Sequence, residues 1–378
     1  MTSIWKMLKL GDVLKLEYGK PLSKEERDDE GAYPAYGANG VKCRTNKFYW
    51  DRPSIIVGRK GSAGEVNLTE KKFWALDVTY FVDFDEKQYD LMFLYYCLKY
   101  QNLTSLAKGV KPGINRNDVY AIECAFPPLP EQKRIVVILD KAFAGISLAV
   151  ANAEKNLANA RELFESYLNN IFTQKGDGWK DNRLGDLTVI QSGGTPLKSK
   201  SDYWDEGDIA WFSSGELNNM ETITPKSKIT PEGLNNSNAK LFPKGSLLIG
   251  MYDTAALKMS ILDRDAAFNQ AISGLKPNDG LDLRFVLHAI NAIKPEVLKL
   301  RRGVRQKNLN LQKIKDIVIS VPEFSEQQFV VKKLLVMEKD VSRLETIYQQ
   351  KLTALNELKQ SILQKAFTGE LTQREENV

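Results

Sequence analysis

The sequence predicts an α+β protein in which two mixed α/β domains are separated by two long helices, with a pseudo-twofold internal repeat. Two observations predict this fold. The chain repeats itself once, with similar residues at the ends of each copy and dissimilar residues between them. The last third of each copy carries apolar residues at alternating steps of three and four, which is the pattern of a long coiled-coil helix.

Length and composition are those of a folded protein of ordinary size. The chain has 378 residues, of which 43% are hydrophobic and 27% charged, and 53 Lys+Arg against 48 Asp+Glu give a net charge of +5. This length corresponds to two or three domains. No apolar run approaches the roughly 18 residues that cross a bilayer, and the start lacks a signal-peptide core. We therefore expect a cytoplasmic protein without a membrane partner.

The chain is poor in residues that carry catalysis. His288 is the only histidine, which excludes a His-rich zinc site and predicts a buried core histidine. The three cysteines form no CxxC pair and are expected to be reduced and structural. The spacing Gly58-x-x-Gly61-x-x-Gly64 lacks the GK[ST] ending of a phosphate loop. The nuclease-like carboxylate of Glu70 has no evident partner carboxylate, and Glu357 lies in the long-helix pattern of the second copy, so we expect no catalytic residue and no metal site.

The internal repeat is visible in short matching segments. Leu10-Gly11-Asp12-Val13 returns as Leu184-Gly185-Asp186-Leu187, 174 residues later, whereas Phe172-Thr173 returns as Phe367-Thr368, 195 residues later. The second copy therefore contains about 21 extra residues, all before Glu326. This pattern indicates a duplicated scaffold with two divergent inserts, because a solenoid requires three or more similar units.

The repeat divides the chain into five segments. We predict a first α/β domain over 1–130, a central helix over 131–173, a second α/β domain over 174–325, a C-terminal helix over 326–371 and a tail over 372–378. At 1.5 Å per residue, a helix of about 40 residues is roughly 60 Å long. The predicted helix seam includes Ile135, Leu139, Ile146, Leu163, Val330, Leu334, Val341, Leu355, Leu358 and Ile362.

Two features of the helices leave alternatives open. Each seam contains one polar residue at the same step, Asn156 and Lys351, which either fixes the register or marks a solvated layer. Each helix also has apolar residues outside the seam. A two-helix coil does not need them, so they are expected to dock against the inserts or against another chain; examples are Phe143, Val150, Leu157 and Leu168.

Two loops are basic at corresponding places in the copies, 108–116 and 301–308. Lys and Arg on glycine-containing loops can approach phosphates, and Arg, Asn and Gln can bind base edges. A basic run is often only a solvated surface. Its recurrence in both copies favours nucleic-acid binding here.

The chain resembles the specificity (S) subunits of type I restriction–modification systems. The resemblance covers almost the whole chain and rests on the duplication and on the Pro-x-x-x-Glu-Gln entry to each helix, at 127–132 and 322–327. It also rests on a recognition-domain signature that begins with Ser192-Gly193-Gly194-Thr195-Pro196 and continues through Trp211 to Leu217. The first copy has Tyr18-Gly19-Lys20-Pro21 in place of that turn, so the first domain is expected to read a different DNA sequence.

The resemblance implies two target recognition domains, each reading one half of an asymmetric bipartite DNA site. It implies an antiparallel coiled coil that sets the spacing between the half-sites and docks two methyltransferase (M) subunits, with restriction (R) subunits joining the complex. S-adenosylmethionine, ATP and magnesium are expected on those partners, and no cofactor on this chain. A stand-alone coiled-coil DNA-binding regulator or scaffold is the alternative.

Candidate DNA-binding residues follow from the polar and basic loops of both domains. In the first domain they are Tyr36, Asn39, Arg59, Lys60, Ser62, Lys108, Lys111 and Arg116. In the second domain they are Thr195, Lys198, Ser213, Ser214, Glu216, Tyr252, Arg301, Arg302, Arg305 and Lys307.

Overall fold

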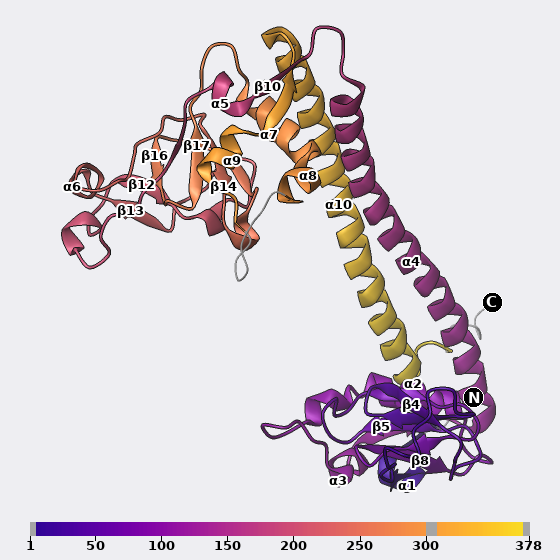
Figure 1. Cartoon of the computed structure of the whole chain (residues 1–378). Helices are drawn as coiled ribbons and strands as arrows, with labels where there is room; N and C mark the ends of the chain where they lie inside the picture. Colours follow the sequence, from indigo (N-terminus) through magenta and orange to yellow (C-terminus); the bar gives the residue numbers. More distant parts are fainter. Residues whose placement is uncertain (1–4, 300–307, 373–378) are drawn as a thin grey trace. The chain divides into compact units, whose positions relative to one another are not determined.

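A computed structural model describes residues 5–299 and 308–372. The chain forms two compact units, one comprising the residues up to Lys155 together with those from Tyr348 onward, and the other Asn156–Ile347. Each unit contains one α/β domain and a segment of both long helices (Figure 1).

The first domain contains three small sheets. A four-stranded sheet has the order β2-β8-β5-β6, a three-stranded sheet the order β4-β3-β7, and β1 pairs with β9. The strands are β1 (Lys6–Lys9), β2 (Leu14–Tyr18), β3 (Tyr33–Gly37), β4 (Gly40–Thr45), β5 (Ile55–Gly58), β6 (Val66–Leu68), β7 (Trp74–Ala75), β8 (Thr79–Phe84) and β9 (Glu123–Phe126). The helices are α1 (Leu10–Val13), α2 (Leu91–Tyr100), α3 (Arg116–Tyr120) and the 3-10 turn η1 (Leu103–Leu106).

The second domain repeats this topology strand for strand. Its sheets have the orders β11-β17-β14-β15, β13-β12-β16 and β10-β18. The strands are β10 (Lys180–Arg183), β11 (Ile190–Ser192), β12 (Ile209–Phe212), β13 (Ser227–Ile229), β14 (Leu247–Gly250), β15 (Met259–Ile261), β16 (Ala266–Phe268), β17 (Ile272–Leu275) and β18 (Val318–Val321). The helical elements are α5 (Leu184–Leu187), α6 (Pro231–Asn235), α7 (Leu283–Ala292), α8 (Lys294–Lys299), α9 (Leu311–Lys315), η2 (Ser201–Tyr203), η3 (Ser214–Glu216) and η4 (Asp253–Ala255).

The repeat predicted from sequence is confirmed by this correspondence, which also locates most of the extra residues. From the start of β12 to the start of β14 the chain runs from Ile209 to Leu247, whereas the equivalent segment of the first domain runs from Tyr33 to Ile55. The longer segment carries η3 and α6. The insertion therefore enlarges one loop region without changing the order of strands.

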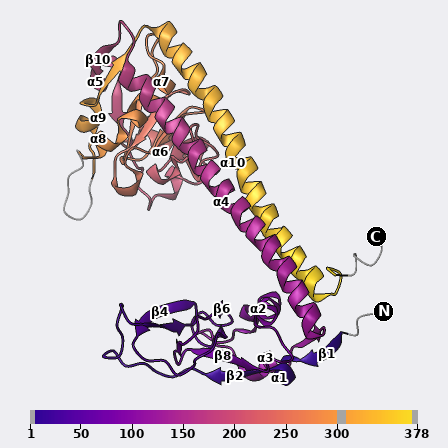
Figure 2. The same cartoon turned by 90° about the vertical axis from the view of Figure 1, so that its right-hand side faces the viewer.

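Both predicted long helices are present, as α4 (Leu129–Gln174) and α10 (Phe324–Phe367). In the first unit the N-terminal part of α4 lies beside the C-terminal part of α10, and in the second unit the opposite ends lie together (Figure 2). The helices are therefore antiparallel.

A buried glutamine fixes the start of each long helix. The amide of Gln132 donates to the carbonyls of Pro127 (2.9 Å) and Gln88 (3.1 Å), and its oxygen accepts from the N–H of Asp90 (2.9 Å). Asp90 in turn caps α2 by accepting from the N–H groups of Met92 and Phe93.

The second copy reproduces this network. Gln327 donates to the carbonyl of Pro322 (2.9 Å) and accepts from the N–H of Asp282 (2.9 Å), which caps α7. The Glu-Gln pair of the sequence motif therefore joins the start of each long helix to the N-terminus of a domain helix.

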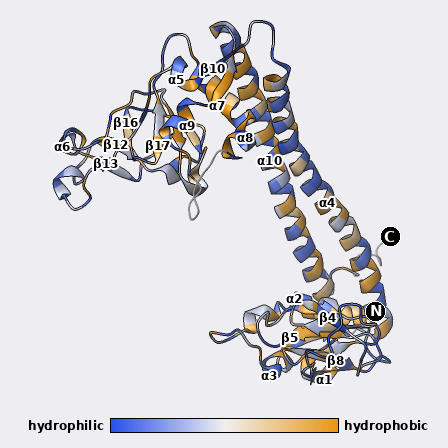
Figure 3. Cartoon of the chain, viewed as in Figure 1, coloured by the Kyte–Doolittle hydropathy of each residue, from blue (hydrophilic) through white to orange (hydrophobic). Residues whose placement is uncertain are grey.

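Each domain core is completed by the C-terminal end of a long helix. Phe367 at the end of α10 packs against Phe93 and stacks on Tyr100 in the first unit, with ring centroids 5.2 and 5.4 Å apart. Phe172 at the end of α4 packs against Phe285 of the second unit at 5.3 Å. Apolar residues accordingly fill the interior of both domains and recur along both helices (Figure 3).

The helix seam differs from the predicted one in its second half. Ile135, Leu139, Ile146, Val330 and Leu334 are buried, and Val341, Leu355 and Ile362 are partly buried. Leu163 and Leu358, however, are 57% and 47% exposed. Beyond residue 153, α4 still covers Ala160 and Tyr167, but Leu157 and Phe164 are partly buried in place of Asn156 and Leu163. In α10, Leu352 replaces Lys351.

The physical reason is the helical period. A straight α-helix drifts about 20° per heptad relative to a strict 3.5-residue repeat, so a constant heptad pattern does not stay on one face. Asn156 and Lys351 are exposed, which supports the solvated layer over a buried register device.

The four apolar residues named above outside the predicted seam are buried or partly buried by this chain. Phe143 packs edge-on against Tyr96 of the first domain at 5.3 Å, and Leu168 is buried in the core of the second unit. Among the described residues, α4 alone is long and apolar enough to cross a bilayer by length and composition, which the short apolar runs did not predict. His288 is 1% exposed, as predicted.

Candidate nucleic-acid interface

Two basic loops of the first domain are hydrogen-bonded to each other. The N–H of Gly61 donates to the carbonyl of Pro112 and that of Ile114 to the carbonyl of Arg59, both at 3.0 Å. These bonds join loop 58–64, which follows β5, to the predicted basic loop 108–116. The structure thus brings together the candidate side chains Arg59, Lys60, Ser62, Lys108, Lys111 and Arg116.

Glycines make the first of these loops possible. A Cβ on Gly58 would lie 2.1 Å from the carbonyl oxygen of Ser62, and one on Gly64 would lie 2.4 Å from the backbone of Leu103. Gly64 also has a φ of +85°, which favours glycine. The repeated glycines therefore serve a tight turn that presents Arg59 and Lys60.

Tyr18 lies at the centre of this surface. Its ring is 47% exposed, and the guanidinium carbons of Arg59 and Arg116 lie 5.4 and 5.2 Å from its centroid. Arg59 also donates two hydrogen bonds to the carbonyl of Asp77, and the ring of Tyr80 packs against Tyr18 at 5.1 Å. These contacts hold two cations beside an exposed aromatic face, a combination suited to phosphates and bases.

We refer to Tyr18, Arg59, Lys60, Lys108, Lys111 and Arg116 as the first-domain cluster. Lys60 and Lys111 are exposed, whereas Lys108 pairs with Asp118 at 3.0 Å. Sequence reasoning missed Tyr18 as a site residue, because its proximity to Arg59 and Arg116 depends on pairing between distant segments. Its equivalence to Ser192 of the recognition-domain signature was the available signal.

Tyr36 does not belong to this surface. It is 4% exposed, its hydroxyl accepts from the N–H of Glu70 at 2.9 Å, and its ring packs edge-on against Phe73. Burial raises the pKa of its hydroxyl. The prediction for Tyr36 is wrong because the side chain forms part of the core, whereas Asn39 is exposed at the turn between β3 and β4.

In the second domain, the recognition-domain signature forms a close-packed turn. A Cβ on Gly193 would lie 2.0 Å from the carbonyl oxygen of Phe268, and one on Gly194 would lie 2.3 Å from the backbone of Asn238. The indole N–H of Trp211 donates to the carbonyl of Gly194 at 3.0 Å. The signature therefore fixes the backbone, while the hydroxyl of Thr195 bonds to Gln270.

Glu216 and Ser213 stabilise their own loop. One carboxylate oxygen of Glu216 accepts from the N–H and hydroxyl of Ser213 (2.9 and 2.7 Å), and the other accepts from the N–H of Lys226 (2.9 Å). Burial alone would raise the pKa of Glu216, but these hydrogen bonds outweigh it and hold the pKa below its usual value. Both oxygens thus hold the loop in place, and contact of Glu216 with DNA stays a prediction.

The remaining candidates of the second domain lie on its surface or outside the described residues. Tyr252 is 40% exposed, Lys198 is exposed and Ser214 is partly buried. The candidates outside the described residues are Arg301, Arg302, Arg305 and Lys307.

The fold defines a class of protein: a duplicated α/β domain with divergent loops, mounted on antiparallel helices. The chain belongs to the family described as the type I restriction modification DNA specificity domain, whose model matches residues 3–156 and again residues 176–360.

Individual relatives agree with this assignment. The specificity subunit of the type I restriction enzyme EcoDI from Escherichia coli is 24% identical over 97% of this chain and 89% of its own length. The EcoR124I/EcoR124II specificity subunit, also from Escherichia coli, is 27% identical over 53% of this chain and 50% of its own length. A solved chain from a study of complex assembly in the type I R-M system matches over 97% of this chain and 98% of its own length, with a TM-score of 0.80 and 18% identity. At that identity the likeness establishes the fold.

Proposed function

We propose that this chain is the DNA-reading subunit of a type I restriction–modification complex, in which each α/β domain binds one half of a bipartite site. One observation carries the proposal: the two domains share every strand pairing among the described residues but differ in their loop chemistry. Tyr18, Arg59 and Arg116 of the first domain correspond to Ser192, Met251 and Leu311 of the second. Two readers with one scaffold and unlike surfaces fit an asymmetric target.

The helix pair is a suitable spacer for two readers. With 46 and 44 residues at about 1.5 Å each, α4 and α10 are about 70 and 66 Å long. One turn of B-DNA is about 34 Å, so linked domains can bind half-sites about one or two turns apart. Linked readers gain effective concentration only when their separation matches that of the half-sites.

We further propose that two M subunits dock on the helices and that R subunits join the assembly. Exposed apolar side chains remain along both helices, including Val137 and Leu148 on α4 and Phe329 and Val336 on α10, each more than half exposed. Methylation and cleavage, with S-adenosylmethionine, ATP and magnesium, then belong to the partners.

Co-expression with a cognate M subunit tests the proposal. We expect a stable complex that methylates adenines in one asymmetric bipartite motif, mapped by sequencing of the host DNA. Absence of both the complex and site-specific methylation would contradict it. Tight site-specific binding by the isolated chain, with no M-type partner, would support a stand-alone regulator instead.

A further inference from the structure

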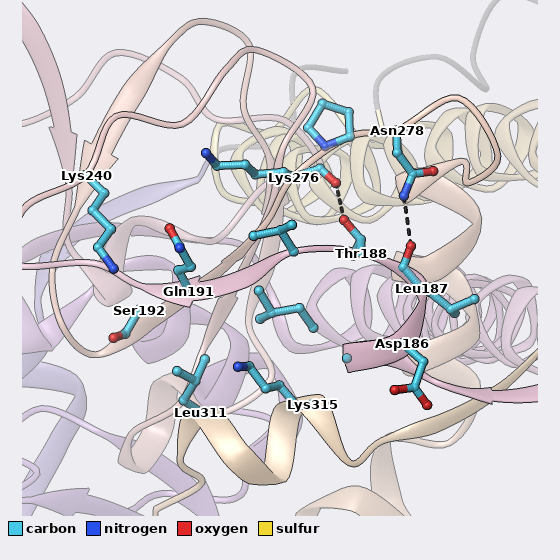
Figure 4. Close-up of a pocket in the computed structure, with 14 residues that line it drawn as sticks. Asp186, Leu187, Thr188, Gln191, Ser192, Lys240, Lys276, Asn278, Leu311 and Lys315 are labelled. Atoms are coloured by element: carbon cyan, nitrogen blue, oxygen red, sulfur yellow. Dashed lines mark hydrogen bonds between the residues drawn. The ribbon is translucent and has the colours of Figure 1, made fainter.

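The second domain contains a basic cleft that the predicted loops do not include. It has a volume of about 770 Å³ and is lined by Lys240, Lys276 and Lys315 together with the polar side chains of Gln191, Ser192 and Asn278. Figure 4 shows the three lysines approaching β11 from separate segments of the chain. We call this site the lysine cleft.

The lysine cleft has a hydrogen-bonded rim and a positively charged lining. Asn278 donates to the carbonyl of Leu187 at 2.8 Å, and Thr188 bonds to the carbonyl of Lys276, which ties the rim together. Within the described part of the chain, none of the three lysines pairs with a carboxylate. Asp186, exposed at the rim, is the one acidic residue of the lining, so positive charge dominates.

The first domain shows that the scaffold does not require this charge. Lys315 and Tyr120 are the last residues of α9 and α3, and each lies against the equivalent glycine, Gly185 or Gly11. In the first domain the Tyr120 hydroxyl accepts from the N–H of Leu16 at 2.7 Å. A neutral ring therefore occupies the position where the second domain presents an ammonium group.

The other two lysines of the cleft also have non-basic residues at the equivalent positions of the first domain. Lys276 bonds to Val189 across the ladder, whereas the equivalent pair of the first domain is Asp83 with Lys15. Asp83 is a carboxylate and pairs with Arg52.

Lys240 lies two residues before Phe242, which bridges to Ala266, just as Phe48 lies two residues before Trp50, which bridges to Phe73. None of the three equivalent positions in the first domain carries a basic residue. The lysines are thus a property of the second domain alone.

We propose that the lysine cleft binds the phosphodiester backbone of DNA beside the half-site read by the second domain. The inference rests on the proposed function. Gln191 and Ser192 lead directly into the Gly193–Pro196 turn of the recognition signature, so the cleft adjoins that turn. Lysine side chains bind phosphates as point charges and carry no sequence information, which makes this an anchoring site.

The test uses the full chain in complex with its M subunit and a fluorescently labelled 40-base-pair duplex carrying the methylated motif. Each phosphate contact contributes about 0.9 to the slope of log affinity against log salt concentration. Single Lys→Gln changes at 240, 276 and 315 should each lower that slope by about 0.9, and the triple variant by about 2.7. The affinities for target and scrambled duplexes should fall by the same factor, because phosphates are common to both.

The equivalent residues of the first domain provide matched substitutions for two of the lysines. Lys315→Tyr and Lys276→Asp install the first domain's residues, and they should reduce the slope without loss of the folded complex, checked by thermal melting. Lys228→Gln, an exposed lysine on β13, is the control and should leave the slope unchanged.

The outcomes separate the two proposals. An unchanged slope in the triple variant, with site-specific binding by the wild type, would overturn the lysine cleft and leave the proposed function standing. A loss of affinity confined to the target duplex would mean that the lysines contact bases, and it would also overturn the phosphate assignment. No site-specific binding by the wild-type complex would overturn both.

Discussion

Replacing Gln132 by Met should destabilise the first unit by about 2–4 kcal/mol. The change keeps the volume of the side chain but removes its three hydrogen bonds, to the carbonyls of Pro127 and Gln88 and from the N–H of Asp90. Each buried polar group left without a partner costs about 1–3 kcal/mol. The bond to Pro127 is buried, while the other two are partly buried, so water recovers part of the loss.

The assay is urea denaturation of the full chain, combined with hydrogen exchange of the segment around Asp90. The midpoint should fall at constant m-value, and the Asp90 amide should lose its protection. Lys133→Ala, at the exposed neighbouring position of α4, should change stability by less than about 0.5 kcal/mol. Gln327→Met should produce the same effect in the second unit. A Gln132→Met variant as stable as wild type would refute the view that this glutamine anchors the helix.

Three further predictions concern other parts of the chain. Phe367→Ala should cost about 3–5 kcal/mol in the first unit, because it removes a ring packed on Phe93 and Tyr100; a loss seen only in the second unit by hydrogen exchange would contradict it. Burial lowers the pKa of His288 to about 4, from 6.5 in an unfolded chain. The unfolded state therefore binds the extra proton first, and stability should fall by about 3 kcal/mol between pH 6.5 and pH 4. His288→Leu should flatten this part of the urea-midpoint profile, and an unchanged profile would refute the assignment. Arg116→Ala should weaken DNA binding by the assembled complex and lower its salt slope by about 1; an unchanged slope would indicate a solvated surface.

The sequence predicted the architecture because the repeat carries it. Residues that recur at a constant offset, such as Gln132 and Gln327, mark positions where the two copies need the same backbone contacts. The apolar spacing located both long helices. The apolar spacing could not locate the whole seam. The predicted pattern repeats every 3.5 residues and the α-helix every 3.6, so the two drift apart along the helix, and Leu163 and Leu358 are exposed.

The site was less predictable, since its residues meet only in the fold. The basic loop 108–116 and Arg59 were found by composition, but Tyr18 joins them through the sheet. Tyr36 has a side chain suited to DNA contact, yet tertiary packing buries it, whereas the carboxylate of Glu216 accepts hydrogen bonds within its own loop. The lysine cleft combines residues from three separate segments of the chain, which only the folded domain brings together.

The central claim is that the helix pair holds two unlike readers at a fixed separation, and lengthening both helices tests it most directly. Seven residues inserted after Lys155 and seven after Ile347 fall between the two units and leave each of them intact. They add about 10 Å, or about three base pairs of B-DNA. Mapping methylated adenines made by the complex should then show unchanged half-sites and a gap about three base pairs longer. Methylation at the original gap would contradict the account.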